Sequence, residues 1–206
     1  MNVLLINGSP HEKGCTYTAL SLIARELNKA GIDTEILYVG GKPVGGCIGC
    51  GGCRSGNGCV FGGVVNEAIE KAKTADGFVF GSPVHYASAS GNMTSFMDRL
   101  SYAGGKYLAY KPAAICCSAR RAGTTSTLDQ LVKYPEFFHM PLVSGSYWPM
   151  VHGSNPEQVL QDAEGCAVMQ ELGRNMAWLL RCIEAGKAAG IQHPENPRRP
   201  MTNFIR

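Results

Sequence analysis

The first 27 residues constrain the fold of this chain more than any other stretch. Residues 2–6 form an apolar run of a length typical of a buried strand. Residues 7–16 interrupt that run with glycine, proline and small polar side chains, as a turn does. A strand that passes through a polar turn into a helix directs unpaired N–H groups of the helix at the strand's carboxyl end, which is a candidate anion site. The helix is indicated by apolar side chains that share one face: Ala19, Leu20, Ile23, Ala24 and Leu27.

The composition of this turn narrows down the anion. The turn matches neither the Gly-x-Gly-x-x-Gly pattern nor the Walker lysine pattern, which disfavours a dinucleotide pyrophosphate and a nucleotide triphosphate. Hydroxyl groups, together with backbone N–H groups that glycine leaves accessible, suit one terminal phosphate, such as that of FMN. An ordinary capped strand-to-helix turn is the alternative. The binding residues predicted here are Ser9, His11, Gly14, Cys15 and Thr16.

The rest of the chain alternates predicted strands and helices. This alternation indicates an α/β fold, in which a parallel sheet has right-handed crossovers and helices on both faces. Ligands of such sheets bind beyond the carboxyl ends of the strands. Further strands are predicted at 33–39, 77–80 and 112–117, with a weaker one beginning at 142; helices are predicted at 64–73, 93–100, 128–134 and, as one helix or two, 157–186.

Size, charge and cysteine content limit the classes of function. The 206 residues suffice for one α/β domain, which we place at residues 1–190, followed by a Pro- and Arg-rich arm at residues 191–206. The net charge of +3 is too small to indicate nucleic acid or an anionic membrane as a partner. No stretch has the length of a membrane span. Nine cysteines cannot all pair with one another, so the sequence favours a reducing compartment and a cytoplasmic location.

A glycine-rich loop at residues 45–60 carries a cysteine motif. Cys47, Cys50, Cys53 and Cys59 follow the spacing C-x2-C-x2-C-x5-C. Cysteines three positions apart turn successive sulfurs inward, and glycine lets the backbone fold closely around a metal group. Three interpretations remain open from the residues alone. The loop holds one iron–sulfur cluster, it holds a tetrahedral zinc ion, or its thiols bind no metal.

Three polar segments that follow predicted strands resemble the flavin loops of one family. They are residues 8–16, which begin Gly-Ser-Pro; residues 81–86, Gly-Ser-Pro-Val-His-Tyr, with Ser-Phe-Met-Asp-Arg at 95–99; and residues 118–125. These segments and their order along the chain resemble those of the NAD(P)H-dependent FMN reductases of the flavodoxin-like fold. The resemblance covers residues 1 to about 148. The resemblance implies a doubly wound five-stranded parallel sheet in the order 2-1-3-4-5, bound FMN, and a homodimer or homotetramer.

The resemblance also implies the residues that contact the flavin. Two positions depart from the family, because Cys15 replaces a small polar residue and His85 replaces tyrosine. Cys15 is either a mildly acidic thiol or a backbone N–H donor, and His85 either reports the redox state of the flavin or stacks on it. Arg120 and Arg121 either bind a negative charge, on the reduced flavin or on a nicotinamide phosphate, or lie in a solvated turn. The implied contacts are Pro83, Val84, His85 and Tyr86 in the second loop and Ser118, Arg120, Arg121, Gly123 and Thr124 in the third.

The cysteine motif resembles the compact motif of iron–sulfur flavoproteins, which belong to the same wider family. This resemblance implies that Cys47, Cys50, Cys53 and Cys59 bind a [4Fe–4S] cluster near the FMN. The sequence departs from that motif after the last cysteine, where residues 61–63 replace the usual acidic side chains. Further along, we expect residues 98 and 99 to form an ion pair on a helix surface or at an interface.

Together these features predict an FMN-dependent oxidoreductase. Electrons would pass from NAD(P)H or a reduced carrier to an acceptor, through a [4Fe–4S] cluster where one is present. The donor and the acceptor are each expected to be a small molecule or a protein. The alternatives are a cluster-free NAD(P)H:FMN or quinone reductase, and a non-enzymatic flavoprotein that acts as an electron carrier or redox sensor. No residue pattern indicates a catalytic nucleophile or carboxylate pair, so the chemistry is expected to belong to the cofactor.

Overall fold

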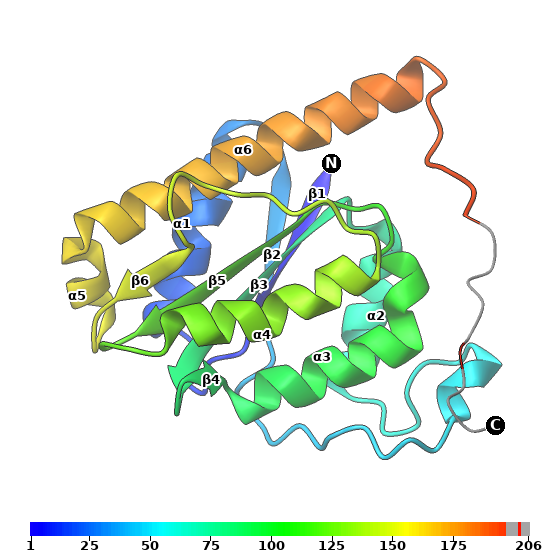
Figure 1. Cartoon of the computed structure of the whole chain (residues 1–206), viewed down its shortest axis with the longest axis horizontal. Helices are drawn as coiled ribbons and strands as arrows, with labels where there is room; N and C mark the ends of the chain where they lie inside the picture. The colour runs from blue at the N-terminus through cyan, green and yellow to red at the C-terminus, as the bar shows by residue number, and fades with distance from the viewer. Residues whose placement is uncertain (197–201, 203–206) are drawn as a thin grey trace.

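The computed structural model describes residues 1–196 and residue 202. Within them, five parallel strands form a sheet between two helical layers (Figure 1). Their spatial order, counted along the chain, is 2-1-3-4-5, which confirms the expected doubly wound topology. The remaining residues of the arm expected at 191–206 lie outside the described residues. The strands are β1 (Asn2–Asn7), β2 (Asp33–Tyr38), β3 (Gly77–His85), β5 (Ala113–Ala119) and β6 (Met150–His152), and a short β4 (Ser88–Ala89) pairs antiparallel with β3.

Helices cover both faces of the sheet (Figure 1). One layer contains α1 and α6, with the short α5 beside them, and the other contains α2, α3 and α4. The long helical stretch expected at 157–186 is two helices, because Asp162 ends α5 and caps α6 by accepting a hydrogen bond from the N–H of Gly165. The helices are α1 (Cys15–Lys29), α2 (Val64–Thr74), α3 (Gly91–Gly104), α4 (Thr124–Phe137), α5 (Pro156–Gln161) and α6 (Ala163–Ala188), with 3₁₀ turns at η1 (Gly52–Ser55) and η2 (Gly105–Tyr107).

Alternation along the strands divides the core into two parts. In β1, Leu4 and Ile6 belong to the cluster under α2, α3 and α4, whereas Leu5 belongs to the cluster under α1 and α6. In β3, Phe78 and Phe80 lie in the first cluster and are fully buried. Burying each such side chain contributes roughly 1.5–3 kcal/mol, so a one-residue slip in strand register is strongly disfavoured. The fixed register brings the carboxyl ends of β1, β3 and β5 to one edge.

The fifth strand begins later than expected. Leu142 makes only an isolated parallel bridge to Ala113, and the chain then runs irregularly until β6 pairs with the last residues of β5. Gly145 and Pro149 lie in this irregular stretch, where glycine weakens a strand and proline cannot donate a hydrogen bond to the neighbouring strand. The resulting loop exposes the ring of Trp148 beside the start of β6.

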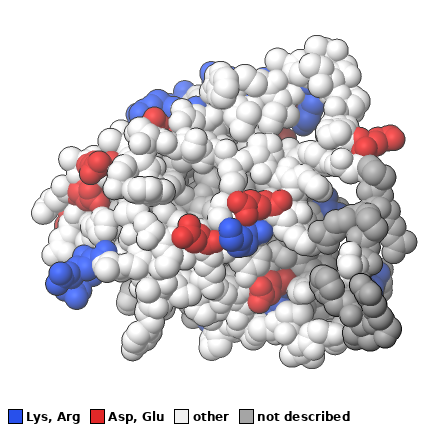
Figure 2. Space-filling model, in the orientation of Figure 1, with Lys and Arg blue, Asp and Glu red and all other residues white. Residues whose placement is uncertain are grey.

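Charged side chains of both signs lie on the surface of the molecule. On the face seen in Figure 2, basic and acidic side chains are interspersed among uncharged residues. Among the helices that the structure describes, none is both long enough and apolar enough to cross a membrane.

Candidate functional site

Three turns meet at the carboxyl edge of the sheet. They are the loop from β1 to α1, the hairpin from β3 to β4, and the loop from β5 to α4 (Figure 1). Hydrogen bonds join them. The N–H of Gly8 donates to the carbonyl of Gly81 at 2.9 Å, Ser90 Oγ donates to the carbonyl of Gly8 at 2.7 Å, and Thr16 Oγ1 and Ser118 Oγ are 2.8 Å apart. These hydrogen bonds hold the three turns together as one unit.

The first turn is fixed by its own polar side chains. The buried Asn7 donates from Nδ2 to the carbonyl of Glu12 at 2.9 Å, and its Oδ1 accepts from the N–H of Ser9 at 3.1 Å. Ser9 Oγ in turn accepts from the N–H of His11 at 3.1 Å. Gly8 is required because a Cβ there would lie 2.8 Å from Met93 Cβ of α3. The turn therefore has a defined shape, with the His11 side chain exposed at its tip.

The start of α1 supplies the hydrogen-bond donors of this turn. Gly14 caps the helix and has no side chain with which to accept from the first-turn N–H groups. Thr16, in that first turn, is buried. The Cys15 thiol points away, donating to the carbonyl of Gly153 at 3.5 Å, and burial raises its pKa. Burial therefore disfavours an acidic Cys15 thiol, and the role of its backbone N–H as a donor in this loop stays a prediction.

The second turn is a tight hairpin at the end of β3. Tyr86 and Ala87 have positive φ angles of 51° and 59° and connect the paired residues His85 and Ser88. The Tyr86 side chain is fully exposed, and His85 is exposed as well. Gln130 of α4 holds the hairpin, since its Oε1 accepts from Ser88 Oγ at 2.7 Å and from the Ala89 N–H at 2.9 Å.

The third turn packs against the second. Gly123, which caps α4, has a φ of +96°, and a Cβ there would lie 2.7 Å from Ala87 Cα. Ser118 and Thr124 are buried, whereas the side chains of Arg120 and Arg121 are exposed. All the residues that the sequence predicts to contact the flavin thus lie at one edge of the sheet. They are Ser9, His11, Gly14, Cys15, Thr16, Pro83, Val84, His85, Tyr86, Ser118, Arg120, Arg121, Gly123 and Thr124.

The donors at this edge suit a phosphate ester attached to a planar ring. Two helices begin here at glycine caps, so both present first-turn N–H groups, while the buried hydroxyls of Ser9 and Thr16 are hydrogen-bonded within the edge. The hairpin with Tyr86 offers exposed apolar and aromatic surface beside them. A mononucleotide flavin needs both kinds of contact.

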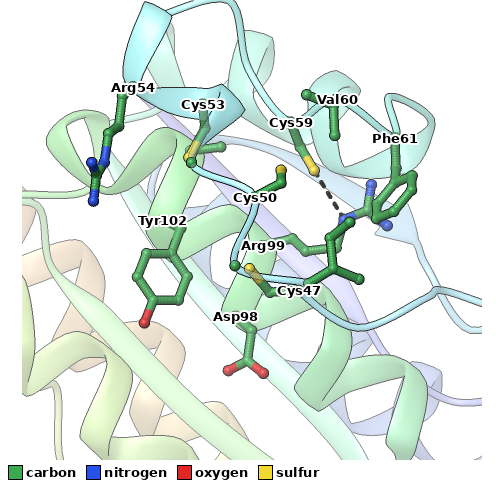
Figure 3. Close-up of a pocket in the computed structure, with 14 residues that line it drawn as sticks. Cys47, Cys50, Cys53, Arg54, Cys59, Val60, Phe61, Asp98, Arg99 and Tyr102 are labelled. Carbon is green, nitrogen blue, oxygen red and sulfur yellow. Dashed lines mark hydrogen bonds between the residues drawn. The ribbon is translucent and has the colours of Figure 1, made fainter.

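The four cysteines of the glycine-rich loop line a cavity of about 610 Å³ between this loop and α3. Figure 3 shows Cys47, Cys50, Cys53 and Cys59 around it. In the described part of the chain, no three or more His, Cys, Asp or Glu side chains are close enough together to hold a metal ion. The four sulfurs therefore line the pocket without converging on one point. Soft thiolates nevertheless match the ligands that iron–sulfur clusters and zinc require.

Cys59 is anchored on two sides. Its backbone N–H donates to Asn66 Oδ1 at 2.8 Å, and Asn66 Nδ2 donates to its carbonyl at 3.0 Å. Arg99 Nε donates to its sulfur at 3.2 Å. Because Asn66 lies on α2 and Arg99 on α3, both helices hold this cysteine.

The model of the NADPH-dependent FMN reductase family matches residues 1–155 of the chain. The chain belongs to this family. An iron–sulfur flavoprotein of Methanocaldococcus jannaschii is 28% identical over 192 residues, which are 89% of this chain and 100% of that protein.

Two solved structures show the same fold. RosB, solved with bound 8-demethyl-8-formylriboflavin-5'-phosphate, has a TM-score of 0.70 at 13% identity over 100% of this chain and 92% of RosB. A flavodoxin from the domain Archaea has a TM-score of 0.61 at 13% identity over 88% of this chain and 99% of the flavodoxin. This member of the FMN reductase family is therefore a flavodoxin-like, FMN-binding oxidoreductase.

The expected ion pair of Asp98 and Arg99 is wrong, because none of the ion pairs among the described residues joins them. Arg99 is only 6% exposed, because it follows Phe96 by three residues and so lies on the buried face of α3. The Asp98 carboxylate instead accepts a hydrogen bond from Tyr134 Oη at 2.7 Å. Burial raises the pKa of Tyr134, and the neighbouring carboxylate raises it further.

Four residues that shape the two sites belong to none of the motifs described above. Asn7 and Ser90 carry local signals, since Asn favours a turn after a strand and Ser90 caps α3 by accepting from the Met93 N–H. Asn66 and Gln130 carry none, because their partners lie in other elements and are defined only by tertiary packing.

Proposed function

We propose that this FMN-dependent oxidoreductase passes electrons from NAD(P)H or a reduced carrier to an acceptor through a [4Fe–4S] cluster. Cys47, Cys50, Cys53 and Cys59 would bind the cluster. The observation that carries the proposal is the single cavity that all four cysteines line. It lies next to α3, the helix that supports the carboxyl edge of the sheet, which we call the flavin edge because the flavin would bind there. The likeness to a protein named an iron–sulfur flavoprotein, over nearly the whole chain, supports it.

The residues at the sheet edge would hold FMN by its phosphate and its ring. Ser9, Thr16 and the first-turn N–H groups of α1 would bind the phosphate, while the hairpin around His85 and Tyr86 would lie against the ring. Bound FMN accepts electrons in pairs as hydride and releases them singly. The exposed Arg120 and Arg121 would attract the anionic donor, since an unpaired positive charge near the edge raises its local concentration.

A second candidate function is supported by the spread of the thiols. Because the sulfurs line the cavity without converging, a cluster-free NAD(P)H:FMN or quinone reductase also fits the described residues. A zinc ion in the same place would be structural, since zinc carries no electrons. No disulfide joins any of the nine cysteines, which suits a reducing compartment, and we therefore propose a cytoplasmic location.

The test is an absorption spectrum of anaerobically purified protein, with iron, zinc and flavin quantified on the same sample. We expect flavin bands, broad visible absorption and about four irons per chain. Cys50→Ser and Cys59→Ser should lose iron and keep flavin. Cys182→Ser, which alters an exposed cysteine of α6 away from the loop, is the matched control and should keep both.

Other outcomes separate the alternatives. Flavin without iron would leave the cluster-free reductase, and zinc in place of iron would assign the loop a structural role. A protein that fails to take up added FMN would contradict the flavin site itself. Anaerobic reduction of the flavin by NADPH, with turnover on a quinone, supports an enzyme; reduction only by reduced ferredoxin supports an electron carrier.

A further inference from the structure

The guanidinium of Arg99 is a buried cation directed at the cysteine loop. The side chain is 6% exposed and makes three hydrogen bonds, one from each nitrogen. Nε donates to Cys59 Sγ at 3.2 Å, Nη1 to the carbonyl of Gly45 at 3.3 Å, and Nη2 to the carbonyl of Gly62 at 3.0 Å. Phe61 covers the guanidinium, with its ring centroid 5.3 Å away. Arg99 thus contacts the segments on both sides of the cysteines, at Gly45 and Gly62, as well as the last cysteine. Figure 3 shows its bond to Cys59.

Among the residues that the structure describes, no carboxylate balances the charge of Arg99. None of the ion pairs among the described residues includes it. Asp98 is its neighbour in sequence, but the Asp98 carboxylate accepts from Tyr134. A buried cation is costly unless an anion or several dipoles compensate it. The two carbonyls supply dipoles, and the sulfur of Cys59, in its thiolate form, is the anion within reach.

We propose that Arg99 is a positioning residue that holds Cys59 in place and raises the reduction potential of the cluster bound by the four cysteines. This inference rests on the proposed iron–sulfur function. Hydrogen bonds and charges at ligand sulfurs are main determinants of cluster potential. Four thiolates give the site excess negative charge, and each added electron increases it. A fixed positive charge at one sulfur therefore favours the reduced state.

The residue type distinguishes this role from simple packing. Arginine presents donors in a planar fork, which matches three acceptors in different directions, and it remains charged when buried. Lysine would keep the charge but could not reach all three acceptors. Glutamine would keep a donor but lose the charge. These two replacements separate the electrostatic effect from the fastening of the loop.

The experiment compares wild type with Arg99→Lys, Arg99→Gln and Arg54→Gln in one-electron redox titrations followed by EPR, with iron and flavin per chain measured on each sample. Arg54 also lines the cavity but is exposed, so its replacement controls for net charge alone. We expect Arg99→Gln to shift the equilibrium between oxidised and reduced cluster by about tenfold towards oxidised, a potential lower by about 59 mV. Arg99→Lys should restore most of this shift, and Arg54→Gln should change it little.

Each other outcome has a definite meaning. An unchanged potential in Arg99→Gln at full iron content overturns the inference, as does an equal shift in Arg54→Gln. If both Arg99 variants bind flavin but no iron, Arg99 only folds the loop and the electrostatic role is overturned. Wild-type protein without iron would instead overturn the proposed function, and the inference would fall with it.

Discussion

At the scale of single residues, buried thiols predict a specific pH dependence of stability. Burial raises the pKa of Cys117 from 9.0 to about 12. Below pH 9 the thiol is protonated in both states, so its contribution is complete. Above pH 9 the unfolded chain releases a proton that the folded chain retains, and the free energy of unfolding falls by about 1.4 kcal/mol per pH unit until the folded pKa is reached. Urea unfolding with reductant between pH 9 and 11 should therefore show a shallower decline for Cys117→Ala.

The control for this prediction is the value at pH 7, where Cys117→Ala should differ from wild type only by the cost of the lost sulfur. Parallel declines in the two proteins above pH 9 would contradict it.

Single residues also show which parts of the site the sequence could not predict. The spacing of the cysteines could be read directly, whereas the burial of Arg99 and its bond to Cys59 depend on how α3 lies against the loop.

At the scale of elements, Gly123 joins the second and third turns of the flavin edge. Its φ of +96° and the 2.7 Å approach of Ala87 Cα leave no room for a side chain. Gly123→Ala should cost roughly 1–2 kcal/mol from the backbone conformation, and it should also displace the hairpin and weaken FMN binding, measured by flavin fluorescence. Gly31→Ala is the matched control, because Gly31 also has a positive φ, of 75°, but open space around it. Equal flavin affinity in the two variants would refute the role of Gly123.

Elements with strong local patterns were predictable, and those defined by tertiary pairing were not. The strands expected at 2–6 and 112–117 and the helix expected at 64–73 match β1, β5 and α2 within two residues. The helices expected at 93–100 and 128–134 are the central parts of the longer α3 and α4. The extension of β3 to His85 and its turn into β4 depend on positive φ angles at Tyr86 and Ala87, which few non-glycine residues adopt. The late start of β6 depends on pairing with Cys117–Ala119.

At the scale of the whole molecule, α3 connects the two sites. Ser90, which caps this helix, holds the flavin edge, since its Oγ donates to the carbonyl of Gly8. Asn92, in the first turn, holds the segment that leads into the cysteine loop by accepting from the Val44 N–H. Two turns further along, Arg99 holds the cysteine loop. A rigid helix thus fixes the separation between the flavin edge and the cysteines, as electron transfer between a flavin and a cluster bound there would require.

The family resemblance also predicts a homodimer or homotetramer, and the exposed aromatic rings indicate where its contact lies. Tyr147 and Trp148 are 49% and 58% exposed, and Leu142 and Val132 line an apolar groove with them. Exposed apolar surface of this kind beside a groove is typical of association sites. Light scattering after size exclusion should show that Trp148→Ser lowers the assembled mass. Trp178→Ser is the control, since Trp178 is 67% exposed on α6 in the opposite helical layer. A monomeric wild type, or dissociation by Trp178→Ser alone, would contradict this assignment.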